Sequence, residues 1–542
     1  MCDKTSVEQL LEIYGQKHLT AFWDQITEEQ RKLLLNDLNS IKFDKVCRAF
    51  KETEETDKDG QNKSIDDLLE PLSSQVHQSI TRSSKETLNA FRETGLREIS
   101  EGRVAALLLA GGQGTRLGVN YPKGMYDVGL PSHKTLYQLQ GERILRLERL
   151  AYDLTGKKAS IPWYIMTSEA TKEPTIEFFE KHDYFGLPAD NVVVFEQSTF
   201  PCFQFDGKII LETPYKVARA PDGNGGLYNA LKEKGILDDM KRRGIQHIQV
   251  YCVDNILVKV ADPTFIGYCI SKGAEAAAKV VQKAFPTEAV GIICKVQGKY
   301  KVVEYSEVSA QTAQKRSADG RLTFDAGNIC NHYFTLNFLN NICGKDLIHH
   351  IAKKKIPYVN SNGQLVKPDK VNGIKLEKFV FDVFGFTDKF VVWEVLREDE
   401  FSPLKNGDGS DKDNPTTARL SIYNLHQRFV LNSGGKFVDE NGKTVPLIAS
   451  PVKVDLNGNT DLDINDKINN NHNESQVICE ISPLVSYDGE GLEEYVSGKR
   501  LQTPFILSGD CVSEGHPLKT AKLTTNLING TNRAATLING HH

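Results

Sequence analysis

The apolar residues of the chain follow two patterns that predict different elements. In the first hundred residues they recur at helical spacing, as in Leu33, Leu34 and Leu38, and the preceding Thr27–Gln30 has the sequence of a capping box. From about residue 100, short continuous apolar runs replace this spacing. The first of these runs, Val104–Leu109, has the length of a strand buried on both faces. The sequence therefore predicts a helical N-terminal unit followed by a sheet.

Strand-like runs alternate with helical patterns beyond this first strand. We expect a helix over Leu136–Leu154 and further buried strands at Trp163–Met166, Asn191–Phe195 and His247–Val253. Such alternation is typical of an α/β fold with a central, mostly parallel sheet. Residues 291–307 have instead the pattern of strand, turn and strand, which predicts an antiparallel insertion.

The same patterns suggest how the 542 residues divide. We expect a helical domain over 1–100, a central α/β domain over 101–400, a small strand-rich domain over 401–510 and a disordered tail over 511–542. Within the first of these, the polar segment 53–64 is expected to be a flexible connection.

Composition and charge narrow the class of protein. Hydrophobic residues make up 39% of the chain and charged residues 25%, as in an ordinary globular protein. The net charge of −5 gives no general basic field, so we expect no nucleic-acid partner. No apolar run approaches the ~20 residues that a membrane span needs, so we expect no membrane association. Ten cysteines without a Cys-x-x-Cys pair are typical of a reduced compartment, which predicts a cytoplasmic location.

A glycine-rich loop directly follows the first predicted strand. Its glycines let the backbone approach a ligand closely and point amides at an anion, while Arg116 and Lys123 add two cations. The pattern is not the dinucleotide fingerprint, because Leu117 occupies the place of its third glycine. Nor is it a P-loop, because the order of Gly and Lys is reversed and Met125 follows instead of Ser or Thr. The two cations suit a triphosphate, and the alternative is a tight turn whose Arg and Lys face solvent.

Five segments together resemble a known family. The loop sequence LLAGGQGTRLGVNYPK, residues 108–123, resembles the signature of nucleotide-sugar pyrophosphorylases that act on UTP. Further blocks match in order: APDGNGG at 220–226, YCVDNILVKVAD at 251–262, NGIKLEKFVFD at 372–382 and LREDEFSPLKN at 396–406. The chain is thereby similar to the eukaryotic UDP-N-acetylhexosamine pyrophosphorylases over roughly residues 5 to 500. This resemblance implies that the sheet is a Rossmann-like nucleotidyltransferase sheet.

The resemblance also implies a reaction. The family joins UTP and N-acetylglucosamine 1-phosphate to give UDP-N-acetylglucosamine and pyrophosphate, by in-line attack on the α-phosphate. N-Acetylgalactosamine 1-phosphate would be a second substrate, because the two sugars differ at one hydroxyl. The implied cofactor is Mg²⁺, the partners are these small molecules, and a homodimer is left open.

The family's functional residues transfer onto matching positions of this sequence. The catalytic cations would be Arg116 and Lys123. UTP would be bound by Leu109, Ala110, Gly111, Gly112, Gln197, Gly223, Asp254 and Lys375. The sugar phosphate would be bound by Asn224, Gly291, Glu304, Asn328, Phe379, Phe381 and Lys405. Asp254 would also bind the metal, since a carboxylate beyond a buried parallel strand is placed for that role.

Other interpretations of these residues stay open. Without the resemblance, Gln197 is a strand-end residue, Asn224 a turn residue, and Phe379 and Phe381 are core residues. At the level of function, the alternatives are a UDP-glucose or broad UDP-sugar pyrophosphorylase, and a non-catalytic regulator that binds nucleotide sugars. Retention of both loop cations favours the enzyme over the regulator.

Overall fold

A computed structural model describes residues 4–60, 65–446, 477–509, 520–524 and 535–538. The chain forms two compact units. The small unit comprises Met1–Leu69, Glu196–Ile236 and Asn341–Phe386, and the large unit comprises Glu70–Phe195, Leu237–Asn340 and Thr387–His542. Both units are assembled from separate stretches of the chain. The predicted domains are instead four consecutive segments of the chain, and that division stays a prediction.

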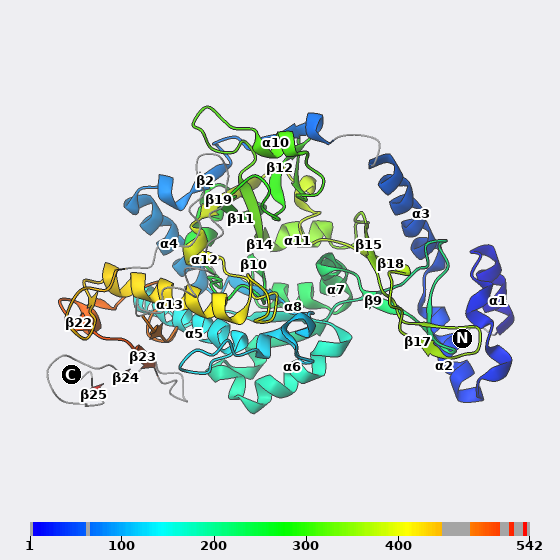
Figure 1. Cartoon of the computed structure of the whole chain (residues 1–542), viewed down its shortest axis with the longest axis horizontal. Helices are drawn as coiled ribbons and strands as arrows, with labels where there is room; N and C mark the ends of the chain where they lie inside the picture. The colour runs from blue at the N-terminus through cyan, green and yellow to red at the C-terminus, as the bar shows by residue number, and fades with distance from the viewer. Residues whose placement is uncertain (1–3, 61–64, 447–476, 510–519, 525–534, 539–542) are drawn as a thin grey trace. The chain divides into compact units, whose positions relative to one another are not determined.

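The large unit is organised around one mixed sheet. Its strands run in the order β2-β19-β11-β14-β10-β3-β4-β5, and Figure 1 shows β10, β14 and β11 within it. Their bounds are His77–Ser79 for β2, Val104–Leu109 for β3, Trp163–Thr167 for β4, Val192–Glu196 for β5, His247–Cys252 for β10, Ala276–Gln282 for β11, Ala326–Thr335 for β14 and Phe390–Val395 for β19. The pairs β10–β3, β3–β4, β11–β19 and β19–β2 are parallel, whereas β14 is antiparallel to both β10 and β11. This confirms the predicted α/β fold with a mostly parallel sheet.

The predicted antiparallel insertion is also confirmed. Strands β12 (Ile292–Val296) and β13 (Lys299–Val303) form a hairpin. It joins the main sheet through Ile292 of β12, which pairs with Gly327 of β14.

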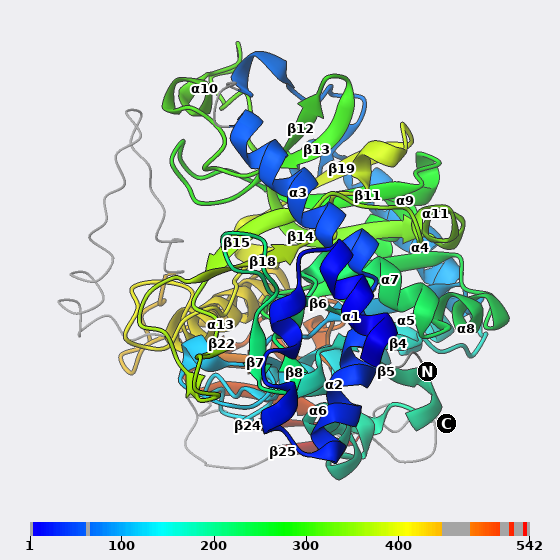
Figure 2. The ribbon, with the colours of Figure 1, turned by 90° about the vertical axis from the view of Figure 1, so that its right-hand side faces the viewer.

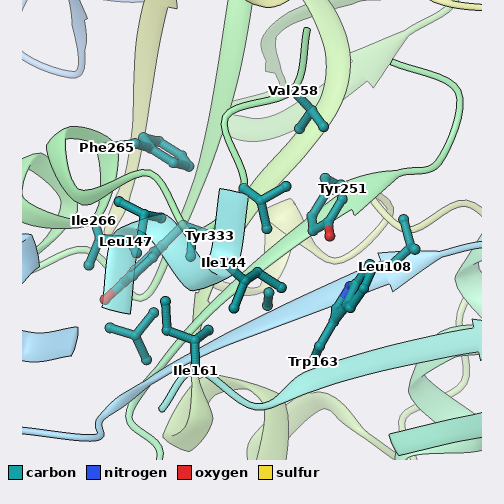
Figure 3. Packing of buried hydrophobic residues seen from close by; sticks show 14 of the residues in the cluster. Leu108, Ile144, Leu147, Ile161, Trp163, Tyr251, Val258, Phe265, Ile266 and Tyr333 are labelled. Atoms are coloured by element: carbon teal, nitrogen blue, oxygen red, sulfur yellow. The ribbon is translucent and has the colours of Figure 1, made fainter. Parts of the chain in front are cut away.

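In its described residues, the large unit also contains ten helices. They are α4 (Lys85–Ser100), α5 (Leu136–Thr155), α6 (Glu169–Lys181), α8 (Ile236–Arg242), α9 (Pro263–Ser271), α10 (Ala310–Gln314), α11 (Leu336–Ile342), α12 (Arg397–Glu400), α13 (Pro415–Asn432) and α15 (Glu493–Val496). Of these, α4, α5, α6 and α9 contribute apolar side chains to the core of the main sheet. Leu108, Trp163 and Tyr251 come from three adjacent strands and lie in the apolar core (Figure 3). A Cβ atom added at Gly95 of α4 would lie 2.1 Å from the Pro263 carbonyl oxygen of α9, so these helices touch through their backbones.

The C-terminal residues of the large unit add two small sheets. Strands β20 (Lys436–Phe437) and β22 (Arg500–Leu501) form one. The other has the order β21-β23-β24-β25, with bounds Cys479–Ile481, Phe505–Gly509, Thr520–Thr524 and Ala535–Ile538. The predicted disordered tail over 511–542 contains β24 and β25 and otherwise lies outside the described residues.

The small unit combines N-terminal helices with short hairpins. The helices are α1 (Lys4–Ile13), α2 (Glu28–Ser40), α3 (Phe43–Gly60) and α7 (Leu227–Glu233). The hairpins pair β6 (Thr199–Pro201) with β9 (Arg219–Pro221), β7 (Leu211–Thr213) with β8 (Lys216–Val217), β15 (His350–Lys354) with β18 (Gly373–Glu377), and β16 (Tyr358–Val359) with β17 (Leu365–Val366). Figure 2 shows β15 beside β18.

Apolar residues from all three stretches of the small unit share one core. Leu34 and Leu38 of α2 lie in it with Phe203 and with Ile374 and Leu376 of β18. The predicted capping box is confirmed, because the Thr27 hydroxyl accepts a hydrogen bond from the Gln30 amide and the Gln30 side chain accepts one from the Thr27 amide.

The expectation of a flexible connection over 53–64 was wrong for most of its length. Helix α3 continues to Gly60, and only 61–64 lie outside the described residues. A run of Glu, Lys and Asp is compatible with a solvated helix face, so high polarity alone did not mark the end of the helix.

None of the described helices has the length and apolar composition that crossing a bilayer requires.

Candidate active site

The glycine loop of the large unit is held in place by hydrogen bonds to its backbone. The Ala110 amide donates to the Met166 carbonyl at 2.8 Å, and the Ser168 hydroxyl donates to the Gly111 carbonyl at 2.9 Å. The Lys123 amide donates to the Gly112 carbonyl at 3.3 Å, which folds the loop back on itself. A Cβ atom at Gly112 would meet no other atom within 4 Å. The loop is therefore fixed at its ends and open at Gly112, where a ligand can approach its backbone.

The two predicted catalytic cations flank this loop. Arg116 is exposed, and its carbonyl accepts a hydrogen bond from the Gly407 amide at 2.9 Å. Lys123 is partly buried, and its Nζ donates to the Leu404 carbonyl at 3.1 Å. In the part of the chain that the structure describes, neither side chain forms an ion pair. Both charges are therefore available to an anionic ligand.

The segment after β10 is tied to the segment that holds Lys123. The Asp254 carbonyl accepts a hydrogen bond from the Leu404 amide at 2.8 Å. The Asn255 side chain donates to the Glu400 carbonyl at 2.7 Å and accepts from the Ser402 amide at 2.9 Å. Leu404 therefore contacts both candidate residues: its amide donates to the Asp254 carbonyl, and its carbonyl accepts from the Lys123 ammonium.

Lys405 and a second carboxylate lie next to these residues. The Lys405 amide donates to the Asp413 carbonyl at 2.7 Å. Burial raises the pKa of the Asp413 carboxyl, the charge of Asp254 raises it further, and that of Lys405 opposes the rise. The Asp254 side chain is partly exposed. Two carboxylates and a lysine thus influence one another electrostatically at this edge of the sheet.

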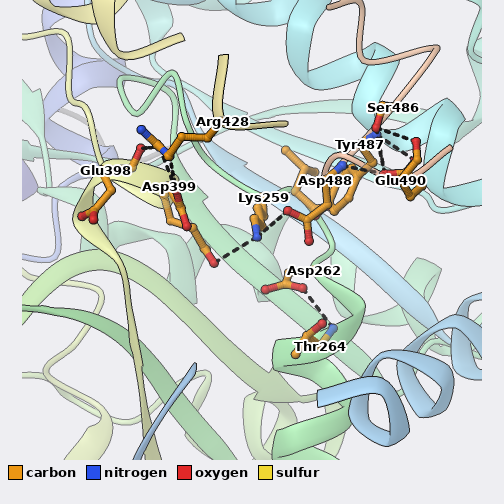
Figure 4. A network of polar contacts seen from close by, with 12 residues as sticks. Lys259, Asp262, Thr264, Glu398, Asp399, Arg428, Ser486, Tyr487, Asp488 and Glu490 are labelled. Carbon is orange, nitrogen blue, oxygen red and sulfur yellow. Dashed lines mark hydrogen bonds and ion pairs between the residues drawn. The ribbon is translucent and has the colours of Figure 1, made fainter. Parts of the chain in front are cut away.

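A buried charge network supports the segments that carry these residues. The Lys279 ammonium is fully buried and lies 2.5 Å from a carboxylate oxygen of Asp262 and 2.5 Å from one of Glu400. Lys259 lies 2.8 Å from Asp488 and 3.6 Å from Glu400 (Figure 4). Desolvation raises the pKa of Glu400 although two lysines face it. The network connects β11 with the segments around 259–262 and 400. Glu400 also accepts the hydrogen bond from the Asn255 side chain through its carbonyl.

The predicted sugar residues of the large unit lie together. The Asn328 amide donates to the Gly291 carbonyl at 2.8 Å. A Cβ atom at Gly291 would lie 3.3 Å from a carboxylate oxygen of Glu304, so that side chain packs over the glycine. This backbone pairing places the Asn328 side chain and the Glu304 carboxylate near Gly291, and side chains of these two types offer the donors and acceptors that sugar hydroxyls require.

Sequence reasoning missed a pair of thiols beside these residues. Cys252 and Cys330 are both partly exposed, and their sulfur atoms lie 3.1 Å apart. The hydrogen bond from the Cys252 thiol lowers the pKa of Cys330, because it stabilises the thiolate. The pair comes from strands 78 residues apart in sequence, so no local spacing could reveal it.

In the small unit, the predicted residues form a second group. The Asn224 side chain accepts a hydrogen bond from the Val380 amide at 2.9 Å, and the Gly225 amide donates to the Lys378 carbonyl at 2.9 Å. Gly223 has a φ of +68°, and a Cβ atom there would lie 2.3 Å from the Lys378 carbonyl oxygen. Glycine is therefore required at 223, and the turn 223–225 packs on the segment that carries Phe379.

Gln197 has an incomplete hydrogen-bond set. The residue is 6% exposed, and within the described part of the chain its Oε1 atom is buried without a hydrogen-bond partner. A buried acceptor without a donor costs free energy, so such an atom points to a ligand that donates to it.

Three further residues complete this group. Phe379 and Phe381 stack with ring centroids 5.1 Å apart, and Phe379 also contacts His350. Lys375 lies on β18, opposite Ala352 of β15, and is partly exposed. The described cavity of the small unit, about 770 Å³, is lined by residues of the segments 204–210 and 358–372, and by none of the predicted site residues.

Comparisons with known proteins show which family the chain resembles over most of its length. Residues 43–458 match the family described as UTP–glucose-1-phosphate uridylyltransferase. The human UDP-N-acetylhexosamine pyrophosphorylase-like protein 1 is 50% identical over 520 residues, which cover 95% of this chain and 99% of that protein. UDP-N-acetylglucosamine diphosphorylase 2 of Arabidopsis thaliana is 41% identical, covering 93% of each chain.

A solved structure agrees with these relatives. The uridine diphosphate N-acetylglucosamine pyrophosphorylase from Trypanosoma brucei, in complex with an inhibitor, has a TM-score of 0.73 at 30% identity and covers 91% of this chain and 95% of that one. The main sheet is thus that of the nucleotidyltransferase fold, as the resemblance implied. The chain belongs to the UTP-dependent uridylyltransferase family, among its UDP-N-acetylhexosamine pyrophosphorylases.

Proposed function

We propose that this chain is a UDP-N-acetylglucosamine diphosphorylase, which transfers the uridylyl group of UTP to N-acetylglucosamine 1-phosphate and releases pyrophosphate. The observation that carries the proposal is the open glycine loop flanked by Arg116 and Lys123, two cations without an ion-pair partner among the described residues. Membership of the family, and the names of its relatives, identify the reaction that such a loop serves.

The chain's part in this reaction is positioning and charge neutralisation. An oxygen of the sugar phosphate attacks the α-phosphorus of UTP in line, and pyrophosphate leaves from the opposite side, so no covalent enzyme intermediate is needed. The backbone from Leu109 to Gly112 would bind the phosphates with Arg116. Lys123, oriented by the Leu404 carbonyl, would neutralise the charge that develops on the α-phosphate and the leaving group.

Mg²⁺ is the cofactor that we propose. Asp254 would hold it, with phosphate oxygens and water as the remaining ligands, and Asp413 is a second carboxylate within electrostatic reach. A partly exposed carboxylate beyond the end of β10 fits a hard cation that prefers oxygen ligands. The cation would neutralise phosphate charge during the transfer.

Uracil and sugar would be recognised by neutral groups. Uracil offers an imide N–H to the unpartnered Gln197 oxygen and a carbonyl to an amide, and Gly223 presents its backbone without a side chain. Gly291, Glu304, Asn328 and Asn224 would bind the sugar, with Phe379 and Phe381 beside the acetyl group. Lys375 and Lys405 would bind phosphates. A cytoplasmic location and a homodimer stay predictions.

The decisive experiment measures pyrophosphate release from UTP and Mg²⁺ with three sugar phosphates. We expect N-acetylglucosamine 1-phosphate to be preferred, N-acetylgalactosamine 1-phosphate to be used at an unequal rate, and glucose 1-phosphate to be poor. Preference for glucose 1-phosphate would agree with the assignment of the glycine loop to the UTP phosphates, but it would overturn the assignment of the sugar residues. A folded protein that binds UTP but releases no pyrophosphate with any of them would be a regulator.

Gln197→Ala should raise the apparent KM for UTP about tenfold and leave kcat nearly unchanged, because one hydrogen bond to the uracil is worth about 1–2 kcal/mol. The measurement is initial rate against UTP concentration at saturating sugar phosphate. Gln364→Ala, at an exposed glutamine of the same unit, is the matched control. An unchanged KM in Gln197→Ala would remove this residue from the uracil site.

Asp254→Asn should raise the Mg²⁺ concentration at half-maximal activity by about tenfold or more, because a neutral amide binds the cation more weakly than a carboxylate does. A titration of activity with MgCl₂ measures this, and Asp388→Asn, at an exposed aspartate of the large unit, serves for comparison. If both variants titrate like the unmodified chain, Asp254 is not a metal ligand.

A further inference from the structure

The two thiols beside the candidate site are brought together by strand pairing. Cys252 is the last residue of β10, and Cys330 lies on the adjacent antiparallel strand β14. The register pairs Val250 with His332 and Tyr251 with Asn331, so Cys252 and Cys330 come next along the same ladder. Their sulfur atoms are 3.1 Å apart, about 1 Å more than the S–S bond length.

A bulge in β14 presents Cys330 to its partner. The pairing of β11 with β14 passes from Lys279 opposite Asn331 directly to Val280 opposite Asn328, so two residues of β14, Ile329 and Cys330, lie between the paired positions. Cys330 has a φ of +52°, which non-glycine residues rarely adopt. Bulges and left-handed residues of this kind redirect side chains beside active sites. The local backbone is therefore adapted to this sulfur contact.

The pair is directly connected to candidate substrate residues. The Cys330 amide donates a hydrogen bond to the Asn328 side-chain oxygen at 3.1 Å, and Asp254 follows Cys252 by two residues. A displacement of either cysteine would therefore move one of these groups.

We propose that Cys252 and Cys330 form a reversible disulfide on oxidation by a peroxide, and that this disulfide lowers the activity of the adjacent site. One thiolate attacks the peroxide, the O–O bond breaks, and a sulfenic acid and one water form. The second thiol then attacks the sulfenic sulfur and expels the second water, so that two thiols and hydrogen peroxide give one disulfide and two waters. Dithiothreitol reduces the disulfide to the two original thiols and is itself oxidised to its cyclic disulfide. The effect on activity rests on the proposed function.

The disulfide lowers activity because it changes the local geometry. Closing the sulfur atoms by about 1 Å shifts the end of β10, the bulge of β14, or both. Displacements of that size at a site that depends on positioning lower rates by an order of magnitude or more. Both cysteine residues retain some solvent exposure, and hydrogen peroxide is a small oxidant.

The test treats the full-length chain with hydrogen peroxide and follows two quantities. Mass spectrometry of peptides, after alkylation without reduction, measures the Cys252–Cys330 linkage, and pyrophosphate release measures activity. We expect the linkage to form, activity to fall about tenfold or more, and dithiothreitol to restore both. Cys252→Ser and Cys330→Ser should each form no linkage and retain most activity in peroxide. Cys47→Ser, at a partly exposed cysteine of the small unit, should behave like the unmodified chain.

Three results would overturn the proposal. The first is that Cys252 and Cys330 stay reduced or become oxidised separately, without a linkage. The second is that the linkage forms and activity is unchanged. The third is that both serine variants lose activity in peroxide as the unmodified chain does. Thermal unfolding of each serine variant confirms that it is folded. If the reduced chain releases no pyrophosphate with any substrate, the proposed function fails, while the linkage is still measured directly.

Discussion

Lys123→Ala should lower kcat about a hundredfold or more while the affinity for N-acetylglucosamine 1-phosphate changes little. The Lys123 ammonium donates one hydrogen bond to the Leu404 carbonyl and has no carboxylate partner in the described part of the chain, so its charge remains for the phosphates. Removing one preorganised donor from the charge that develops in a transition state costs about 10²–10³ in rate. Interactions that strengthen in the transition state affect kcat more than binding.

Steady-state kinetics and a direct binding titration separate these two effects. Lys272→Ala, at an exposed lysine directly after α9, is the control and should be indistinguishable from the unmodified chain. Near-normal kcat in Lys123→Ala would contradict the assignment of this residue to transition-state stabilisation. An equal loss of binding and rate would assign it to ground-state binding instead.

Lys279→Ala should lower the free energy of unfolding by about 3–5 kcal/mol at neutral pH, because it removes the cation nearest to two buried carboxylates and leaves only the more distant Lys259 beside them. Asp262 and Glu400 each have an oxygen 2.5 Å from the Lys279 ammonium. Glu400 also anchors the Asn255 side chain through its carbonyl, so activity should fall together with stability.

The deficit should shrink as the pH falls. Burial already raises the pKa of Glu400, and loss of the lysine charge raises it further. A group with a higher pKa in the folded state binds protons more tightly there, so acid stabilises the variant relative to neutral pH. Unfolding by urea at about pH 7 and about pH 5 measures this against the Lys272→Ala control. A deficit that stays constant or grows in acid would show that the network is not held by these charges.

Continuous apolar runs made the main sheet predictable. The strand expected at Val104–Leu109 is β3 with the same bounds, and the helix expected over Leu136–Leu154 is α5, longer by one residue. Both are buried elements whose apolar pattern follows directly from their environment. The glycine loop was also evident, because glycine and two cations after a buried strand have few other uses.

Features that depend on pairing between distant strands could not be predicted. The bulge at Cys330 arises where the pairing of β14 with β11 shifts. Cys330 has a positive φ, and cysteine is not a residue type whose presence predicts that conformation. The buried position of Lys279 was equally hidden, since a lysine within a strand is ordinarily solvated and its burial depends on ion pairs with Asp262 and Glu400, which are distant in sequence. The unpartnered oxygen of Gln197 likewise depends on packing that no local pattern encodes.

The order of synthesis on the ribosome determines when the core of the small unit can form. Helix α2 emerges early, but its Leu34 and Leu38 pack with Phe203 and with Ile374 and Leu376. At about 5–20 residues per second, the interval between these segments is tens of seconds. During that time the N-terminal helices expose apolar faces, while most of the large unit's sheet is already available. Nascent chains halted before residue 373 should therefore engage chaperones through their N-terminal helices, and release of β18 should end that dependence.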